Sequence, residues 1–322
     1  MKQNIWVLTE QRDGRPSPTA LELVSAARGL AGSVEAFSFG DGVAECAAAL
    51  GAHGAQVLRD LGTLGGSLAG PRVAAAIALA MASRGAPDAV LLPSTYDGRD
   101  VAARLSARTD RPVLANVTGL VEEGGELVSE HAVFGGSEIV RARFTSEGPG
   151  IFVVRPKSFV AEPVAGRAAV VEAMELPDEL STDAARVVAS SGDQRLGPSL
   201  DEAAVVVSGG RGIGSEANFA LIERLARALG GAVGASRAVV DAGWVPYSYQ
   251  IGQTGKTVKP EVYLACGISG ATQHLVGMRG AKHVIAINND PGAAIFRSSD
   301  LGVVADVNDL LPRLIAALEA RR

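Results

Sequence analysis

The chain has 322 residues, of which 47% are hydrophobic and 4% are aromatic, and its mean hydropathy is +0.20. This length favours two domains, and the apolar fraction is sufficient for buried cores, which argues against disorder. The formal net charge of −5 argues against a general nucleic-acid-binding protein, because neutralising phosphates requires a basic face.

The first half of the chain alternates strand and helix patterns, beginning with an apolar stretch at residues 4–8. That stretch is too short for a signal peptide, and no segment approaches ~20 consecutive apolar residues, so we expect a cytoplasmic protein that is not embedded in a membrane. The alternation predicts a parallel sheet with right-handed crossovers. The expected strands are 4–8, 34–39, 56–58, 89–92 and 113–116, and the expected helices are 20–30, 43–50, 73–84 and 101–107.

From residue 118 to residue 154 the pattern changes to short alternating runs. Gly124-Gly125 and Gly135-Gly136 are typical of hairpin turns, which predicts antiparallel strands added to the parallel sheet. Residues 171–201 are polar and acidic, as linkers are, and we place a domain boundary near residue 192. The predicted N-terminal domain, residues 1–192, resembles adenine-nucleotide hydrolase folds in its layout.

A second series of strands and helices occupies the predicted C-terminal domain, residues 193–322. Five expected parallel strands indicate a compact Rossmann-like unit, so the fold class is α/β with two parallel-sheet domains. The expected strands are 204–208, 232–234, 262–265, 284–287 and 302–305, and the expected helices are 216–229, 271–278 and 307–318.

A glycine loop follows the first strand of this second series. Its spacing is Gly210-x-Gly212-x-Gly214, which departs from the dinucleotide fingerprint because Ser215 stands where the last glycine is required. A ligand-binding loop and a plain strand-to-helix turn both remain open. Arg211 favours a ligand, because a guanidinium inside the loop can pair with a phosphate.

Residues 252–257 read Gly-Gln-Thr-Gly-Lys-Thr and imitate the end of a P-loop. The complete motif requires glycine where Gln250 stands, and the preceding segment contains Pro246, so an NTPase is rejected. A loop that presents Thr254 and backbone amides to a ligand and a solvated turn both remain open.

Several polar side chains follow strands of the second series, and each also has a purely structural explanation. Arg237 alone would be a solvated arginine, His274 a helix residue with a satisfied ring, and Asp306 the cap of the last helix. All of them nevertheless lie at strand ends or in the loops beyond, which share one edge in a parallel sheet. The full set is Arg211, Arg237, Thr254, Ser269, His274, Asn288 and Asp306.

Disulfide and metal sites are not expected. Cys46 and Cys266 are the only cysteines and lie in different halves of the chain. His274 and His283 lack helical i, i+4 spacing, and no acidic partner accompanies them, so we assign no metal ligands.

The segment from Tyr263 to Met278, followed by Ala286-Ile287-Asn288, resembles the signature of the alpha subunit of electron-transfer flavoprotein. Residues 208–212, 233–238 and 252–256 match this family in order and spacing. The resemblance covers about residues 204–320, whereas the first domain resembles the family in layout only. It implies that the C-terminal domain binds FAD non-covalently and that the N-terminal domain packs on a separate beta subunit.

The resemblance also implies which residues contact FAD. Arg237 would lie over the ring, Thr254 would hydrogen-bond N5, and Arg237 and His274 would stabilise negative charge on the N1–O2 edge as a cation or as a donor. These three would tune the redox behaviour, and Arg211 with the glycine turns would hold the pyrophosphate. Departures from the family pattern are Thr272 and Asn289. The complete implied set is Arg211, Ser236, Arg237, Ile251, Gly252, Gln253, Thr254, Ser269, Gly270, Ala271, Thr272, Gln273, His274, Asn288, Asp306 and Val307.

The expected function is therefore electron carriage without substrate chemistry of the chain's own. Electrons would come from flavin dehydrogenases such as the acyl-CoA dehydrogenases of fatty acid beta-oxidation, and would pass to a membrane quinone reductase or another acceptor. AMP or a second nucleotide would belong to the partner subunit. These dehydrogenases and reductases would be transient partners.

Three alternatives remain open. The first is a variant of the complex that oxidises NADH and bifurcates its electrons. The second is a nicotinamide-dependent dehydrogenase, which requires an acidic ribose-binding residue about 20 residues after the glycine loop; Glu216 and Glu223 come too early and Asp241 comes late. The third is a nucleotide-sensing or scaffold module, based on the layout of the first domain.

Overall fold

The computed structural model describes residues 3–134, 138–174, 185–189, 200 and 203–320. The chain divides into two compact units, residues 1–190 and 191–322. The boundary predicted near residue 192 lies outside the described residues, so the domains 1–192 and 193–322 stay a prediction.

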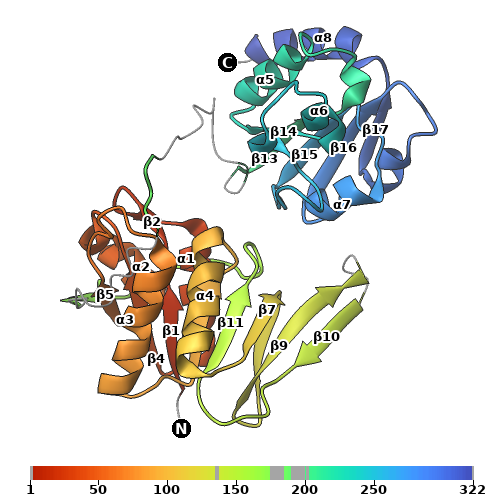
Figure 1. Cartoon of the computed structure of the whole chain (residues 1–322). Coiled ribbons are helices and arrows are strands. Elements are labelled where there is room, and N and C mark those ends of the chain that lie inside the picture. The colour runs from red at the N-terminus through yellow and green to blue at the C-terminus, as the bar shows by residue number, and fades with distance from the viewer. Residues whose placement is uncertain (1–2, 135–137, 175–184, 190–199, 201–202, 321–322) are drawn as a thin grey trace. The chain divides into compact units, whose positions relative to one another are not determined.

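The first unit is built on a seven-stranded sheet in which all neighbouring strands are parallel (Figure 1). Its central strands are almost continuously apolar, because a parallel sheet covered by helices buries both faces of each strand. In spatial order the strands are β12 (Val170–Ala173), β5 (Val57–Asp60), β4 (Ser33–Ser38), β1 (Asn4–Leu8), β6 (Ala89–Pro93), β11 (Gly150–Val154) and β7 (Val113–Val117).

Helices cover both faces of this sheet. Ile5 and Val7 of β1 pack into one core with α1 and α2, whereas Trp6 and Leu8 pack into the other core with α3 and α4. This division follows from the alternation of side chains along a strand. The helices are α1 (Pro18–Leu30), α2 (Ala47–His53), α3 (Ala69–Arg84) and α4 (Tyr96–Thr109), with a 3₁₀ turn η1 (Val43–Cys46) before α2.

The predicted antiparallel strands are present, but they form a separate three-stranded sheet of β8 (Gly119–Glu123), β9 (Glu126–Val133) and β10 (Glu138–Ala142). Gly124 and Gly125 make the turn between β8 and β9 with φ of 62° and 89°, whereas Gly135-Gly136 lies outside the described residues. Residues 150–154 do not belong to this sheet. They form β11, which is buried throughout and joins the parallel sheet.

The predicted linker 171–201 begins inside strand β12, which pairs with the edge strand β5. Arg59 of β5 is only 3% exposed, and its guanidinium pairs with Glu35 at 2.6 Å and with Glu172 of β12. A buried charge requires such partners. A short hairpin, β2 (Gln11–Arg12) with β3 (Arg15–Pro16), completes the strands of this unit among the described residues.

The second unit contains the five parallel strands expected from the sequence. Numbered along the chain, their spatial order is 2-1-3-4-5, which is the flavodoxin-like variant of the doubly wound fold. The direction of winding reverses between β13 and β15, and ligands bind outside the carboxyl ends of the strands at such a point. In spatial order the strands are β14 (Ala232–Ala235), β13 (Val205–Gly209), β15 (Val262–Cys266), β16 (His283–Asn288) and β17 (Leu301–Val304).

Two helices pack on one face of this sheet and α7 packs on the other. Helix α5 begins at Phe219, three residues after the predicted start, and buries Phe219, Ile222 and Leu225. The helices are α5 (Phe219–Ala228) and α8 (Val307–Glu319) on one face, α7 (Thr272–Met278) on the other, and α6 (Arg237–Asp241) after β14. Short 3₁₀ turns are η4 (Arg211–Ile213), η5 (Tyr247–Tyr249) and η6 (Ala294–Ser298). Within the described part of the chain, no helix combines the length and apolar composition needed to span a bilayer.

Candidate functional site

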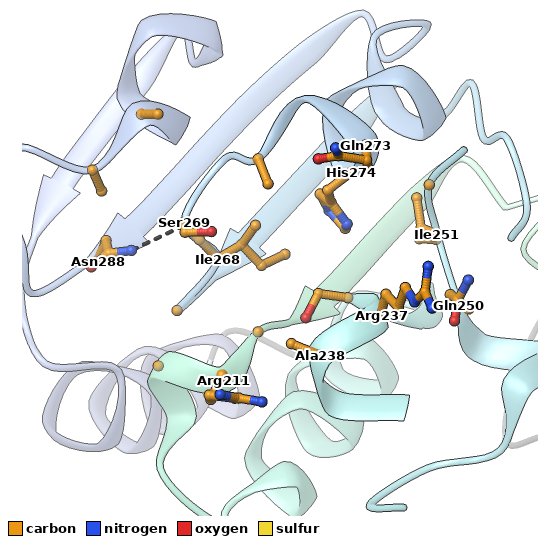
Figure 2. A pocket seen from close by; sticks show the side chains of 18 of the residues that line it. Arg211, Arg237, Ala238, Gln250, Ile251, Ile268, Ser269, Gln273, His274 and Asn288 are labelled. Carbon is orange, nitrogen blue, oxygen red and sulfur yellow. Dashed lines mark hydrogen bonds between the residues drawn. The ribbon is translucent and has the colours of Figure 1, made fainter. Parts of the chain in front are cut away.

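A cavity of about 1040 Å³ opens at the carboxyl ends of the strands in the second unit (Figure 2). Gly210 follows β13, Ser236 follows β14, Gly267 follows β15 and Asn288 ends β16, and all four line the cavity. The cavity therefore lies at the edge and the switch point where the fold favours ligands. The strand ends share one rim, as the sequence predicted.

Most residues of the set implied by the family resemblance line this cavity. Figure 2 shows Arg211, Arg237, Ser269, His274 and Asn288 around its open centre. Their contact with FAD stays a prediction. The lining members of the set are Arg211, Ser236, Arg237, Ile251, Gly252, Gln253, Thr254, Ser269, Ala271, Gln273, His274 and Asn288.

The remaining members of the set, Gly270, Thr272, Asp306 and Val307, are not among the lining residues. Gly270 has φ of +88°, and a Cβ at this position would lie 2.2 Å from the backbone nitrogen of Ile295. Asp306 caps α8, since its Oδ1 accepts a hydrogen bond from the Asn308 N–H at 2.7 Å. Val307 belongs to the core, and Thr272 is exposed at the start of α7.

The cavity also contains residues that sequence reasoning did not select. Asp241 lies four positions after Arg237. Oppositely charged residues at i and i+4 on a helix are neighbours, so this spacing could have predicted that Asp241 lies beside Arg237. Gln250 stands in the sequence where a P-loop requires glycine, and it gives no other signal there. Others are Ala238, Ile268, Asp290, Gly292, Ala293 and Ala294.

Two loops at the floor of the site are in direct backbone contact. The Gly210 N–H donates to the Cys266 carbonyl at 2.8 Å, and the Gly212 N–H donates to the Gly267 carbonyl at 2.9 Å. Gly267 has φ of +63°, and a Cβ there would lie 2.8 Å from the Gly212 carbonyl carbon. Only glycine combines this backbone conformation with so close an approach.

The same contacts change the expected role of the glycine loop. Besides Gly210 and Gly212, the N–H groups of Ile213 and Gly214 also donate to protein carbonyls. Amides that are already paired have no proton left for a phosphate. The guanidinium of Arg211, which is exposed on η4, is therefore better suited to an anion than these four N–H groups are.

The loop that imitates a P-loop is tied down at three points. The Ile251 N–H donates to the Ala235 carbonyl at the end of β14 at 2.9 Å. The Lys256 N–H donates to the Gln250 carbonyl at 2.8 Å, and the Gln253 N–H donates to the Gln273 carbonyl of α7 at 2.7 Å. The loop is therefore a fixed wall of the cavity between β14 and α7. Thr254 is exposed at its tip.

Arg237 carries its positive charge at the solvent-exposed rim. Its side chain is 65% exposed, and its Nε lies 3.1 Å from Oδ2 of Asp241. Both residues line the cavity. An exposed pair of this kind is weak, but Asp241 offsets part of the positive charge that the sequence assigned to Arg237.

His274 is buried at the cavity wall, with 6% of its surface exposed. Burial lowers the pKa of His274 to about 4, and the nearby backbone of Ile251 acts in the opposite direction. The ring is thus neutral at pH 7. Of the two roles that the sequence left for His274, hydrogen bonding fits the structure and a permanent positive charge does not.

The two ring nitrogens of His274 have different surroundings. Nε2 lies 2.9 Å from the hydroxyl of Tyr263, whereas Nδ1 makes no hydrogen bond of good geometry within the described residues. Tyr263 is completely buried, and this burial raises the pKa of its hydroxyl, with Ser208 acting in the opposite direction. Tyr263 therefore stays protonated and holds the imidazole against β15.

Two protein-family models match the chain. The electron transfer flavoprotein domain matches residues 5–179, and the electron transfer flavoprotein FAD-binding domain matches residues 199–279. The electron transfer flavoprotein subunit alpha of Mycobacterium tuberculosis H37Rv is 40% identical over 324 residues, which cover 99% of each chain. The chain belongs to the electron transfer flavoprotein alpha subunit family. The resemblance carried by residues 263–278 is thereby confirmed.

Other electron transfer flavoprotein alpha subunits match as well. That of Mycobacterium leprae is 45% identical over 244 residues, covering 76% of this chain and 75% of the relative. That of Thermoanaerobacterium thermosaccharolyticum is 35% identical over 327 residues, covering 98% of each. The family match therefore includes the first unit, for which the sequence motifs gave only a likeness of layout.

Proposed function

We propose that this electron transfer flavoprotein alpha subunit holds FAD non-covalently in the cavity of its second unit and acts as an electron carrier in a heterodimer with a beta-type subunit. The observation that carries the proposal is the convergence of loops from four neighbouring strands on a cavity of about 1040 Å³, mostly within the matched FAD-binding segment. When bound, FAD would supply the redox chemistry. The chain would bind and orient the cofactor and would make no bond to a substrate.

The cavity fits this cofactor in size and in chemistry. Its volume of about 1040 Å³ is at the upper end of the ~300–1,000 Å³ range of small-molecule sites, as a large dinucleotide requires. Arg211 supplies a guanidinium for the pyrophosphate, and Ile251 and Ile268 supply apolar walls for a ring. The buried Nδ1 of His274, which makes no hydrogen bond of good geometry among the described residues, is a polar atom that a ligand would satisfy.

Three side chains would adjust the redox behaviour of the bound ring. Arg237 would place positive charge near it, and Thr254 and His274 would contribute hydrogen bonds without a net charge. Such groups favour the form of a ring that has gained negative charge, because they are already oriented toward it. These roles rest on the family resemblance and on the position of all three residues at the cavity.

The finer assignments are also part of this proposal. Electrons would come from flavin dehydrogenases such as acyl-CoA dehydrogenases and leave to a membrane quinone reductase or another acceptor, in the cytoplasm, with AMP or a second nucleotide in the partner subunit. A nicotinamide-dependent dehydrogenase is not favoured. The strand end that would carry its ribose-binding carboxylate carries Ser236 and Arg237, and Asp241 is paired with Arg237.

Co-expression with a beta-type subunit tests the proposal. The purified complex should be yellow, should show flavin absorption in the visible range, and should release FAD on denaturation. A colourless complex whose spectrum and stability do not respond to added FAD would contradict it. Adding NADH to the same sample separates the simple carrier from the bifurcating alternative, because only the latter would bleach the flavin with NADH alone.

Arg211→Ala is expected to weaken FAD retention roughly tenfold or more, because a charge-assisted hydrogen bond to the pyrophosphate is lost. Arg224→Ala is the matched control, since Arg224 is an exposed arginine of the same unit that pairs with Glu319 and does not line the cavity. The dissociation constant of FAD, measured by fluorescence of the released cofactor, should change only in the first variant. Equal retention in both variants would place the pyrophosphate elsewhere.

Arg237→Ala is expected to keep FAD but to lower its reduction potential by a few tens of millivolts, because one nearby positive charge is removed. Asp241→Asn removes the opposite charge of the same ion pair, so it should raise the potential. Redox titration of both variants at low and high salt checks this, and both shifts should shrink with salt because the side chains are exposed. An unchanged potential in Arg237→Ala would mean that the guanidinium is too far from the ring.

A further inference from the structure

The side chain of Gln250 is buried beside the cavity and faces the tip of the loop. It is 2% exposed, and its Nε2 lies 3.0 Å from Oγ1 of Thr254. Both residues line the cavity, and Gln250 is labelled in the view of the cavity in Figure 2. Neither the sequence motifs nor the family models assign a role to Gln250.

This contact fixes the direction of the Thr254 hydroxyl. An amide N–H donates and cannot accept, so Oγ1 of Thr254 is the acceptor in the contact. The hydroxyl proton of Thr254 is then free to be donated to another acceptor. Because Thr254 is exposed at the cavity, the free direction for that donation is the ligand space.

The rest of the loop keeps this geometry in place. The backbone of Gln250 is bridged to Ala235 at the end of β14, and its carbonyl accepts from Lys256. The Tyr247 hydroxyl donates to the Thr254 carbonyl, which is a backbone contact and does not set the rotation of the Thr254 hydroxyl. Thr254 is therefore oriented before a ligand arrives, and a ligand need not order it.

We propose that Gln250 is a positioning residue that makes Thr254 a hydrogen-bond donor toward the ring of the bound flavin. The inference rests on the proposed function, because it requires FAD in the cavity. A donor that is held in place strengthens as electron density rises on the ring atom it faces, so it favours the reduced cofactor. Without Gln250, the hydroxyl would rotate and would also present its lone pairs to the ring.

A double-mutant cycle on the co-expressed, FAD-loaded complex tests this. Thr254→Val removes the hydroxyl and keeps the side-chain shape, Gln250→Met removes the amide donor and keeps the length, and a third complex carries both changes. Tyr247→Phe is the matched control, because it removes the other contact to Thr254 without touching the hydroxyl. The flavin potential and the visible absorption spectrum are measured for each, together with the FAD dissociation constant.

Gln250→Met should lower the potential and shift the flavin spectrum in the same direction as Thr254→Val, and should have no further effect when Thr254 is already valine. Tyr247→Phe should leave both readouts near those of the wild type. The inference is overturned if Gln250→Met changes neither readout, or changes them equally with and without the Thr254 hydroxyl. A wild-type complex that retains no FAD would instead overturn the proposed function, and the inference with it.

Discussion

Gly267→Ala should destabilise the second unit by about 2–5 kcal/mol and should abolish FAD retention. Two costs combine at this position. A non-glycine residue at φ of +63° costs about 1–2 kcal/mol, and a methyl group 2.8 Å from the Gly212 carbonyl carbon forces a backbone shift that costs a further 1–3 kcal/mol or so. Because the displaced loop carries Arg211, the site would be distorted as well.

Gly230→Ala is a matched control for the backbone term. Gly230 has φ of +64°, nearly the same as Gly267, but an added Cβ would meet nothing within 4 Å. This variant should therefore cost only about 1–2 kcal/mol and should keep its FAD. Urea unfolding of the two complexes, with FAD retention after gel filtration, makes the comparison. Equal losses in both variants would show that the close approach of the two loops contributes nothing.

Protonation of His274 should by itself lower the free energy of unfolding of the second unit by about 3 kcal/mol between pH 6.5 and pH 4. In the folded chain burial lowers the pKa of His274 from its ordinary value of 6.5 to about 4, and each pKa unit corresponds to about 1.4 kcal/mol. Between pH 6.5 and pH 4, His274 binds a proton in the unfolded chain but not in the folded chain. Stability is therefore complete above pH 6.5 and is lost as the pH falls toward 4.

His274→Gln should remove this part of the pH dependence, although it also weakens the contact with Tyr263 at every pH. His283→Gln is the control, because His283 is an exposed histidine of the same unit on β16. Urea unfolding at pH 7, 5.5 and 4.5 gives the slope of stability against pH for each protein. If the wild type and His274→Gln lose stability in parallel, the buried imidazole is not the group that titrates.

The sequence predicted most of the fold because the strands of a doubly wound protein are apolar runs with little ambiguity. It failed where local pattern and environment disagree. Gly150–Val154 follows a series of antiparallel strands, so the local pattern predicts that it belongs with them, but it is completely buried and pairs in the parallel sheet. Val170–Ala173 is an exposed edge strand of four residues, and such a short strand is hard to distinguish by pattern from the polar, acidic stretch that follows it.

The site was predictable as far as strand ends and family motifs reach. Arg211, Ser269 and Asn288 follow strands, and a parallel sheet brings such residues to one edge. The roles of Gln250 and Asp241 were not predictable, because each depends on which atom of a neighbouring side chain it contacts. The neutral state of His274 depends on burial by residues far away in sequence, and no local spacing reports that.

The backbone contact between Gly212 and Gly267 joins the loop that carries Arg211 to the loop that carries Ser269. We therefore expect the two loops to move together, so that Arg211 and Ser269 keep a constant separation and offer a preformed pair of contacts to a ligand in the cavity.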